Sequence, residues 1–360
     1  MPKRKKAVTT LDVARAAGVS QSTVSMVLNN SEYGSFTEQT RQKVYQACIS
    51  TGYRGLAVSK SNNTEKTILT ICPSCGNPDY MVAVETIQKC CFRAGYSNLT
   101  LFSLRNPEIE KKILQTISSQ SIDGVIFLYK PENPWLISNI ESLVPSISVC
   151  DHDPLISFDS IETNSDKIGS IIAQHLIDLG HEHIAFVATE LSDKHSLRVN
   201  RLNGIKKTYQ LNGFDPDESV IACTFASEGL SMRDNMTDYE AGFILANSII
   251  EKYNITALVG NNDMVSFGII DAIQRMKKRI PQDYSVCGCD NTSLTNIKSL
   301  SLTTVDNYTS LRATEAVDVL IRKIKNARNS EKENSPISTV KVEYTPKLVL
   351  RSSTGPARST

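Results

Sequence analysis

The chain has 360 residues, which is too long for one ordinary domain and sufficient for two or three. Hydrophobic residues make up 40% of it and charged residues 21%, a composition that excludes general disorder. No stretch approaches the roughly 20 apolar residues of a membrane span, and no apolar run follows the basic residues 1–6, as a secretory signal requires. We therefore expect a soluble, cytoplasmic protein of several domains.

The formal net charge of +1 conceals an asymmetry along the chain. Residues 1–66 contain ten Lys and Arg against four Asp and Glu, a net charge of +6. The other residues contain 29 basic against 34 acidic side chains, a net charge of −5. A small basic segment on a mildly acidic body is typical of a protein whose N-terminal part contacts phosphate groups.

The nine cysteines indicate a reducing compartment. Their number is odd, Cys90 and Cys91 are adjacent, and most of the others lie in apolar stretches, where a free cysteine acts as a small hydrophobic residue. Cys72 and Cys75 have the spacing of half a zinc or redox site, but no second pair follows at ligand distance. We therefore expect no disulfide framework, no metal and no cofactor.

Residues 8–54 have the pattern of three or four short helices. Thr9 and Asp12 form a capping-box-like start, Gly18 breaks the first helix, and Ser20 and Thr37 begin the next two. Apolar residues that face one another at helical spacing include Val13, Ala14, Val24, Val27, Leu28, Val44, Ala47 and Cys48. Two helices joined by a tight glycine turn, with a third to complete the core, form a helix-turn-helix.

The alternative for this segment is an ordinary three-helix domain without a nucleic-acid role. The charge of +6 and the basic arm of residues 3–6 favour DNA, because phosphate neutralisation needs this surplus. Gln21 and Ser22 begin the second helix, where side chains reach base edges in the major groove.

The order of residues in this segment resembles a known family. Residues 8–20, VTTLDVARAAGVS, followed by Thr23-Val24-Ser25, Val27-Leu28-Asn29 and Thr40-Arg41, are similar to the DNA-binding head of the LacI/GalR family of bacterial transcription regulators. The resemblance implies that Gln21 and Ser22 read bases and that Thr23 and Ser25 lie near the DNA backbone. The expected DNA contacts are Gln21, Ser22, Thr23, Ser25, Met26, Asn29, Arg41, Tyr53, Val58 and Lys60.

Three positions depart from the family pattern. Most relatives have, after the residue matching Ser25, an arginine that reads guanine, whereas this chain has Met26, which offers only apolar contact. Residues 52–61 resemble the family hinge, a short helix that wedges a leucine into the minor groove. Gly55 replaces the usual proline there and Val58 takes the wedge position, so a plain flexible linker over 55–66 is the alternative.

From residue 67 short apolar strands alternate with amphipathic helices. The expected strands are 68–72, 99–102, 124–128, 146–150, 184–187, 257–259 and 285–288. The expected helices are 81–94, 108–118, 135–143, 168–179, 201–211, 242–253 and 265–276. Repeated strand–helix units predict two α/β lobes with parallel sheets, and ligands bind outside the carboxyl ends of such strands. A cleft between the lobes is therefore the expected ligand site.

The body also resembles the family, through Asn77-Pro78, Gly180-His181, Asn262-Asp263 and Gly288-Cys289-Asp290 among other landmarks. This implies a head at residues 1–54 and a type I periplasmic-binding-protein-like body at 67–354 whose chain crosses between lobes three times. The implied boundaries are 67–162 with 291–322 for the lobe nearer DNA, 163–290 with 323–354 for the other lobe, and 355–360 for the tail.

The resemblance assigns six residues to an effector site: Asp79, Tyr80, Asp151, Arg201, Asn262 and Asp290. Asp79 and Tyr80 take the places of two family aromatics, so that Tyr80 would stack on an apolar ring face while Asp79 suits hydroxyl groups. The family's aromatic of the far lobe falls near Thr237, with Met236 and Tyr239 beside it. Carboxylates, an amide, a guanidinium and one ring together suit a sugar.

We therefore expect a homodimeric transcription regulator, more specifically a repressor, that binds a pseudo-palindromic operator under the control of a sugar. The alternatives are control by a nucleobase or a protein partner, and a solute-binding receptor, which shares the body fold but would need a secretion signal and no DNA head. No phosphate-binding loop, dinucleotide fingerprint or nucleophile elbow is present, so we expect no enzyme activity.

Overall fold

A computed structural model describes residues 8–28, 36–53, 66–119, 121–131, 140, 144–151, 158–192, 196–232, 236–329 and 339–358. The chain divides into two compact units, residues 1–65 and 66–360, called here the head and the body. Each is described by itself. No helix among the described residues is long and apolar enough to cross a membrane.

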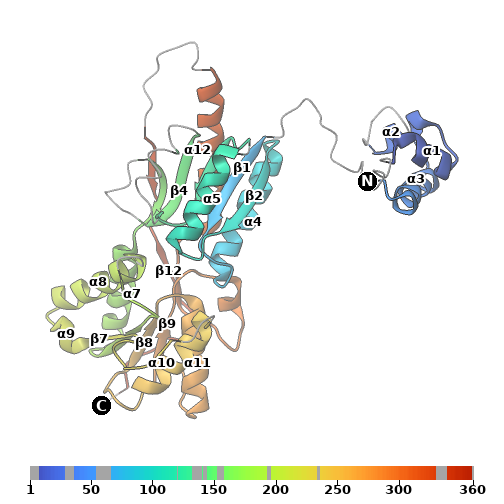
Figure 1. The fold of residues 1–360 in the computed structure, drawn as a ribbon. Coiled ribbons are helices and arrows are strands. Elements are labelled where there is room, and N and C mark those ends of the chain that lie inside the picture. The colour runs from blue at the N-terminus through green and yellow to red at the C-terminus, as the bar shows by residue number, and fades with distance from the viewer. Residues whose placement is uncertain are drawn as a thin grey trace. The chain divides into compact units, whose positions relative to one another are not determined.

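The head is a bundle of three helices, α1 (Thr10–Ala17), α2 (Gln21–Leu28) and α3 (Glu38–Thr51) (Figure 1). Their ends follow the predicted signals. Thr9 and Asp12 form a reciprocal capping box, Gly18 ends α1 in the left-handed conformation, and Thr37 accepts a hydrogen bond from the amide of Thr40. The core consists of the predicted residues Val13, Ala14, Val24, Val27, Val44, Ala47 and Cys48, with Leu28 packed against it.

The first lobe of the body contains a six-stranded parallel sheet in the order β11-β5-β4-β3-β1-β2. Its strands are β1 (Thr67–Cys72), β2 (Ser97–Phe102), β3 (Gly124–Phe127), β4 (Ser146–Asp151), β5 (Asp159–Thr163) and β11 (Lys341–Glu343). Its helices are α4 (Pro78–Arg93), α5 (Pro107–Ser119) and α12 (Thr309–Asn329). The helix expected at 135–143 falls almost wholly outside the described residues.

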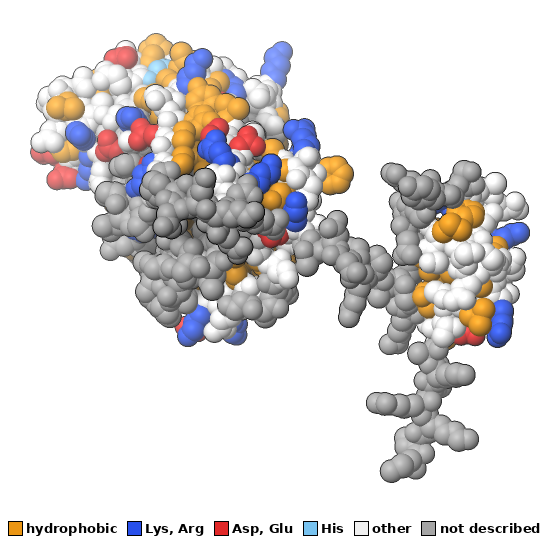
Figure 2. Space-filling view, turned by 90° about the horizontal axis from the view of Figure 1, so that it is seen from above, with side chains coloured by type: hydrophobic (Ala, Val, Ile, Leu, Met, Phe, Trp, Pro, Cys, Tyr) orange, Lys and Arg blue, Asp and Glu red, His pale blue; other side chains and the backbone are white. Residues whose placement is uncertain are grey.

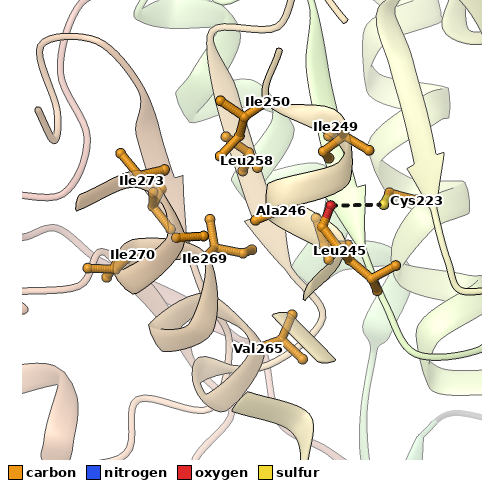
Figure 3. Close-up of a cluster of buried hydrophobic side chains, with 14 of the residues drawn as sticks. Cys223, Leu245, Ala246, Ile249, Ile250, Leu258, Val265, Ile269, Ile270 and Ile273 are labelled. Carbon is orange, nitrogen blue, oxygen red and sulfur yellow. Dashed lines mark hydrogen bonds between the residues drawn. The ribbon is translucent and has the colours of Figure 1, made fainter. Parts of the chain in front are cut away.

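The second lobe contains a four-stranded parallel sheet in the order β7-β6-β8-β9. Its strands are β6 (Ile184–Val187), β7 (Val220–Cys223), β8 (Ala257–Gly260) and β9 (Ser285–Cys287). Its helices are α7 (Ser165–Asp178), α8 (Ser196–Leu211), α9 (Pro216–Ser219), α10 (Asp238–Ile249) and α11 (Asp263–Arg275). Figure 3 shows side chains of α10 and α11 packed on Leu258 of β8, where the Cys223 thiol donates to the carbonyl of Leu245. The predicted fold class, a helical head and a two-lobed α/β body, is confirmed.

The chain crosses between the two lobes three times, as the family resemblance implied. It passes from β5 to α7, from β9 to α12 through β10 (Thr304–Asp306), and from β11 to the C-terminal segment through β12 (Lys347–Val349). Strands β10 and β12 pair antiparallel in the connecting region (Figure 1).

The lobe boundaries differ from the predicted ones at two places. Residues 323–329 and 339–343 belong with the first lobe, because Ile324 of α12 lies in its core and β11 pairs with β5. Residues 291–303 belong with the second lobe, because Leu302 lies in its core and Thr292 donates to Asp263. The local sequence of these segments does not indicate which lobe they pack against, because that choice depends on tertiary contacts.

The C-terminal segment packs into the second lobe. The imidazole of buried His181 contacts the hydroxyls of Thr256 (2.8 Å) and Ser285 (2.9 Å) and the carbonyl of Gly355 (3.0 Å). The amide of Ala357 donates to the carbonyl of Leu179. His181 is therefore satisfied inside the lobe and serves to fix the segment that follows β12.

Candidate nucleic-acid interface and inter-lobe cleft

Helix α2 presents one buried face and one exposed polar face. Val24 and Val27 are buried in the head core, whereas Gln21, Ser22 and Ser25 are exposed. The side-chain amide of Gln21 donates to the hydroxyl of Thr10 at 2.9 Å, which orients it at the start of α2. The residues expected to read bases therefore lie on the surface of the helix that a helix-turn-helix places in the major groove.

The other predicted DNA contacts fall into two groups. Thr23, Met26, Arg41 and Tyr53 are half-buried, and Thr23 is tied to the capping hydroxyl of Ser20 through its amide at 3.0 Å. The remaining contacts lie outside the described residues: Asn29, Val58 and Lys60. The predicted hinge at 55–66, with Gly55, lies outside them except for Lys66.

Thr9→Ala is expected to destabilise the head by about 1 kcal/mol, because it removes a capping side chain from α1. In the native head Thr9 bonds both ways with Asp12, its amide donating to the carboxylate at 2.8 Å. Amide hydrogen exchange in α1 should accelerate accordingly, whereas Gln42→Ala on the exposed face of α3 should leave it unchanged. Equal exchange rates in the two variants would remove the capping role.

A cavity of about 450 Å³ lies between the two lobes of the body. The helices that follow β1, β6 and β8 begin at it, because the carboxyl ends of parallel strands meet at one edge of a sheet, and α12, which follows β10, begins at it too. Among the described lining residues are four arginines and three aspartates: Arg105, Arg198, Arg201, Arg312, Asp79, Asp238 and Asp290. The cavity is therefore strongly polar and carries both signs of charge.

On the first-lobe side, α4 and α12 supply the polar groups. Asn77 caps α4 and its side-chain amide donates to Asp290 of the second lobe at 3.3 Å, a direct bond between lobes. Asp79, in the first turn of α4, accepts a 2.5 Å hydrogen bond from the hydroxyl of Thr309. Arg312, one turn along α12, is buried and donates through Nε to the carbonyl of Asn307. These bonds fix the carboxylates before any ligand arrives.

On the second-lobe side, Arg201 and Asn262 are buried at the cavity wall. Arg201 of α8 donates through Nη1 to the carbonyl of Asn261, while its Nε has no hydrogen-bond partner among the described residues. Asn262 caps α11 through its side-chain oxygen and donates to Asp238 at 2.7 Å. An unpaired buried guanidinium nitrogen is costly, so a ligand acceptor at this point would be strongly favoured.

The buried aspartates have perturbed protonation. Burial raises the pKa of Asp290 well above its usual range and raises that of Asp263 to about 7, and the charge of Asp79 acts in the same direction on both. Arg201 opposes the shift at Asp290. Near neutral pH the side chain of Asp263 therefore exchanges between a carboxylate that only accepts hydrogen bonds and a carboxyl that also donates one.

Asp263→Asn is expected to flatten the pH dependence of body stability between about pH 5 and 7.5. A carboxyl whose folded pKa is raised stabilises the protein at low pH, and that contribution is lost as the pH rises through the folded value, here about 7. The measurement is the difference in urea midpoint between wild type and variant at each pH, in which the contribution of the histidines cancels because both proteins share it. A difference that stays constant across this range would contradict the assignment.

Five of the six predicted effector residues line the cavity: Asp79, Tyr80, Arg201, Asn262 and Asp290. Asp151 is placed differently. It is buried at the end of β4, accepts from the amide of Ser165 at 2.8 Å and from Asn200 at 3.0 Å, and is not among the described lining residues. Its carboxylate joins β4 to the starts of α7 and α8, a structural role that a strand-end position alone does not distinguish from a ligand contact.

The sequence did not indicate several lining residues. Arg105 follows β2 and Asn307 follows β10, so the strand-end rule could have found both. Arg198 lies one turn before Arg201 on α8, a spacing that places both on one helix face. The far wall, where the family has an aromatic, carries Met232, Met236 and Leu197, while Thr237 caps α10.

The comparisons with known proteins agree with this architecture. Residues 9–55 match the bacterial regulatory proteins of the lacI family, and residues 173–354 match the periplasmic binding protein-like domain. The HTH-type transcriptional repressor PurR of Histophilus somni (strain 2336) is 30% identical over 349 residues, which cover 95% of this chain and 97% of that protein.

Two solved structures have the same fold. A LacI family transcriptional regulator from Enterococcus faecium with bound ribose has a TM-score of 0.68 and 20% identity, covering 81% of this chain and 100% of that one. The transcriptional regulator CelR in complex with cellobiose has a TM-score of 0.66 and 20% identity, covering 96% and 99%. The chain therefore belongs to the LacI family of bacterial regulatory proteins, which are DNA-binding transcription regulators and not enzymes.

Proposed function

We propose that this regulator is an operator-binding repressor whose affinity for DNA is set by a sugar bound in the inter-lobe cleft. The observation that carries the proposal is the cavity of about 450 Å³ with polar groups from both lobes, above all the Nε of buried Arg201, which has no hydrogen-bond partner in the part of the chain that the structure describes. The similar protein PurR is a transcriptional repressor, which supports repression as the effect of this protein on transcription. Because its target is DNA, we place the protein in the cytoplasm.

The lining residues favour a polyol over a nucleobase. Asp79, Asp290 and Asn262 are held in place and present acceptors and donors of the kind that hydroxyl groups need. Tyr80 is the aromatic residue among the described lining residues, and the opposite wall is formed by methionine and leucine. A flat base would gain more from rings on both faces, whereas a sugar needs one stacking surface.

Homodimers would place two heads on a pseudo-palindromic operator. Exposed hydrophobic side chains of the first lobe include Val82 and Phe92 of α4 and Leu99 and Phe102 of β2. Figure 2 shows hydrophobic side chains grouped on one face of the body. Strand β2 lies at the edge of its sheet, and an exposed apolar edge strand tends to pack against another chain. We propose that this surface joins two copies, so Phe92→Glu should convert a dimer to monomers in sedimentation experiments.

Effector binding would act on DNA through the lobes. A ligand that contacts α4 from one lobe and α8 from the other favours one relative position of the lobes, and only such differential affinity shifts a conformational equilibrium. The three crossings between lobes carry that movement toward the residues before β1. Operator and effector must then alter each other's affinity by the same factor.

The regulator proposal is tested by mobility shift with DNA that flanks the gene of this protein, at low salt, with and without a panel of sugars and nucleobases. We expect a shifted complex whose affinity falls steeply with salt, because the basic head neutralises phosphates. A change of affinity with a sugar supports the proposed effector, and a response to nucleobases alone would reassign it. No complex at low salt would refute the regulator proposal.

Met26 leads to a prediction about the operator. At this position of α2 a methionine offers apolar contact to a thymine methyl and cannot form the bidentate bond of arginine to guanine. Selection of binding sites from random DNA should therefore give no guanine preference at the matching base pair, and Met26→Arg should create one of roughly 1–3 kcal/mol. A guanine preference in the wild type that Met26→Ala leaves unchanged would contradict this.

A further inference from the structure

Two arginines that the family resemblance does not assign line the cleft from opposite lobes. Arg105 follows β2 of the first lobe, and Arg198 lies in the first turn of α8 of the second lobe. Their side chains line one and the same cavity. Like charges that face each other across a cleft repel, and an anion between them converts that repulsion into attraction from both sides.

The position of Arg105 is held by an unusual backbone. Leu104 and Arg105 both have positive φ, 52° and 49°, a region that is sparsely populated by residues other than glycine. Such conformations persist only where the surroundings determine them, and they gather at ligand sites. The guanidinium of Arg105 donates to the hydroxyl of Tyr80 at 3.2 Å and lies 5.4 Å from the ring centre of Tyr129. These contacts hold the guanidinium of Arg105 beside Tyr80 at the cavity wall.

Arg198 is held from the other side. Its Nη1 donates to the hydroxyl of Thr189 and to the carbonyl of Glu190 at 3.4 Å, both at the end of β6. Burial lowers the pKa of Arg198 and the charge of Arg105 acts in the same direction, although an arginine stays protonated at neutral pH. Asp238 and Glu190 offset part of its charge, but the Asp238 carboxylate already accepts from Asn262.

Two of the aspartates among the described lining residues accept hydrogen bonds from neutral side chains. Asp79 accepts from Thr309, and Asp290 accepts from Asn77 and, at 3.4 Å, from Asn307. The cavity therefore has one region of aspartates that suits hydroxyl groups and a second region where Arg105 and Arg198 meet Tyr80. A ligand that matches both regions carries hydroxyls at one end and an anionic group at the other.

We propose that the effector is a phosphorylated sugar whose phosphate binds between Arg105 and Arg198. This deepens the proposed function and rests on it, since it takes the cleft as the effector site. Guanidinium groups recognise phosphate oxygens through two parallel hydrogen bonds, which makes arginine the suited residue for this group. A phosphate held from both lobes also ties ligand binding directly to lobe closure.

The test is calorimetric titration of the full-length protein with matched probes: ribose, ribose 5-phosphate, glucose, glucose 6-phosphate, glucuronate and inorganic phosphate. We expect at least one phosphorylated sugar to bind about tenfold or more tightly than its neutral counterpart. Arg105→Gln and Arg198→Gln should each remove that preference, so that each variant binds the phosphorylated and the neutral sugar with affinities within about threefold of each other. Arg275→Gln, on the exposed side of α11, is the control that should retain it.

Each outcome decides one claim. Neutral sugars that bind as tightly as phosphorylated ones, a preference that survives both substitutions, or no binding of any phosphorylated probe up to about 5 mM would overturn the phosphate subsite. Glucuronate binding that equals glucose 6-phosphate binding would overturn phosphate as the anion and assign a carboxylate. If a neutral sugar and its phosphate bind the wild type equally tightly, and neither binds Arg201→Ala, the phosphate subsite fails while the effector cleft stands.

Discussion

Replacing Arg201 by alanine is expected to abolish effector binding and to leave DNA binding by the head intact. The guanidinium is buried at the cavity wall, donates to the carbonyl of Asn261, and opposes the raised pKa of Asp290 and Asp79. Truncating one partner of a buried, hydrogen-bonded charge contact with a ligand costs about 2–5 kcal/mol of binding free energy, which corresponds to a loss of affinity of at least about thirtyfold.

Titration of the effector that the panel identifies, followed by calorimetry, measures this loss. The matched control is Arg275→Ala, because Arg275 is exposed, pairs with Asp271 one turn away on α11 and lies over the ring of Phe243, and it is not among the described lining residues of the cleft. Unchanged affinity in Arg201→Ala would remove this residue from the site. Loss of operator binding in the same variant would show that the substitution damages more than the cleft.

Introducing a side chain at Gly204 is expected to destabilise the second lobe severely. A Cβ atom at Gly204 of α8 would lie 2.0 Å from the carbonyl oxygen of Asp166, and one at Gly169 of α7 would lie 2.0 Å from the carbonyl oxygen of Arg201. The two helices therefore cross in direct backbone contact, and backbone has nowhere to move without separating them. Gly204→Val should cost about 3 kcal/mol or more.

Urea unfolding of the body followed by circular dichroism measures this cost. Gly76→Ala is the control, because the nearest atom to its added Cβ would be 3.9 Å away and its φ is not positive. Gly169→Ala should also weaken effector binding, since its Cβ would push on the backbone of Arg201. An unfolding midpoint of Gly204→Val equal to that of the control would contradict the close crossing.

The head was predictable because its signals are local. A capping threonine, a glycine in the left-handed conformation and apolar residues at helical spacing act within a few residues, and Thr9, Gly18 and Val24 lie where these rules place them. Most strands of the body were predictable for the same reason, since β1, β4, β6 and β8 are buried apolar runs.

Strand β5 could not be predicted, because its sequence is polar and its stability comes from distant partners. Asp159 is buried, accepts from the amide of Val340 at 2.7 Å and pairs with Lys323 of α12 at 2.5 Å. No sequence pattern near residue 159 predicts an ion pair with Lys323, which lies 164 positions later in the chain. The lobe assignment of β11 and of the last residues of α12, from residue 323 on, failed for the same reason.

The cleft was predictable in part. Its location follows from the carboxyl ends of parallel strands, and Arg201, Asn262 and Asp290 were found through the family resemblance. The resemblance could not find Arg105 and Arg198, because what makes them a pair is the approach of two lobes. It also included Asp151, whose hydrogen bonds to Ser165 and Asn200 become visible only in three dimensions.

The central claim is that occupancy of the inter-lobe cleft changes the affinity of the head for its operator. It is tested most directly by fluorescence anisotropy of labelled operator with the full-length protein, in the absence and presence of a saturating sugar or sugar phosphate from the panel. We predict that the ligand changes the operator affinity by about fivefold or more, and that saturating operator changes the effector affinity by the same factor. Neither change should occur in Arg201→Ala. A ligand that binds the cleft and leaves operator affinity unchanged would contradict this claim.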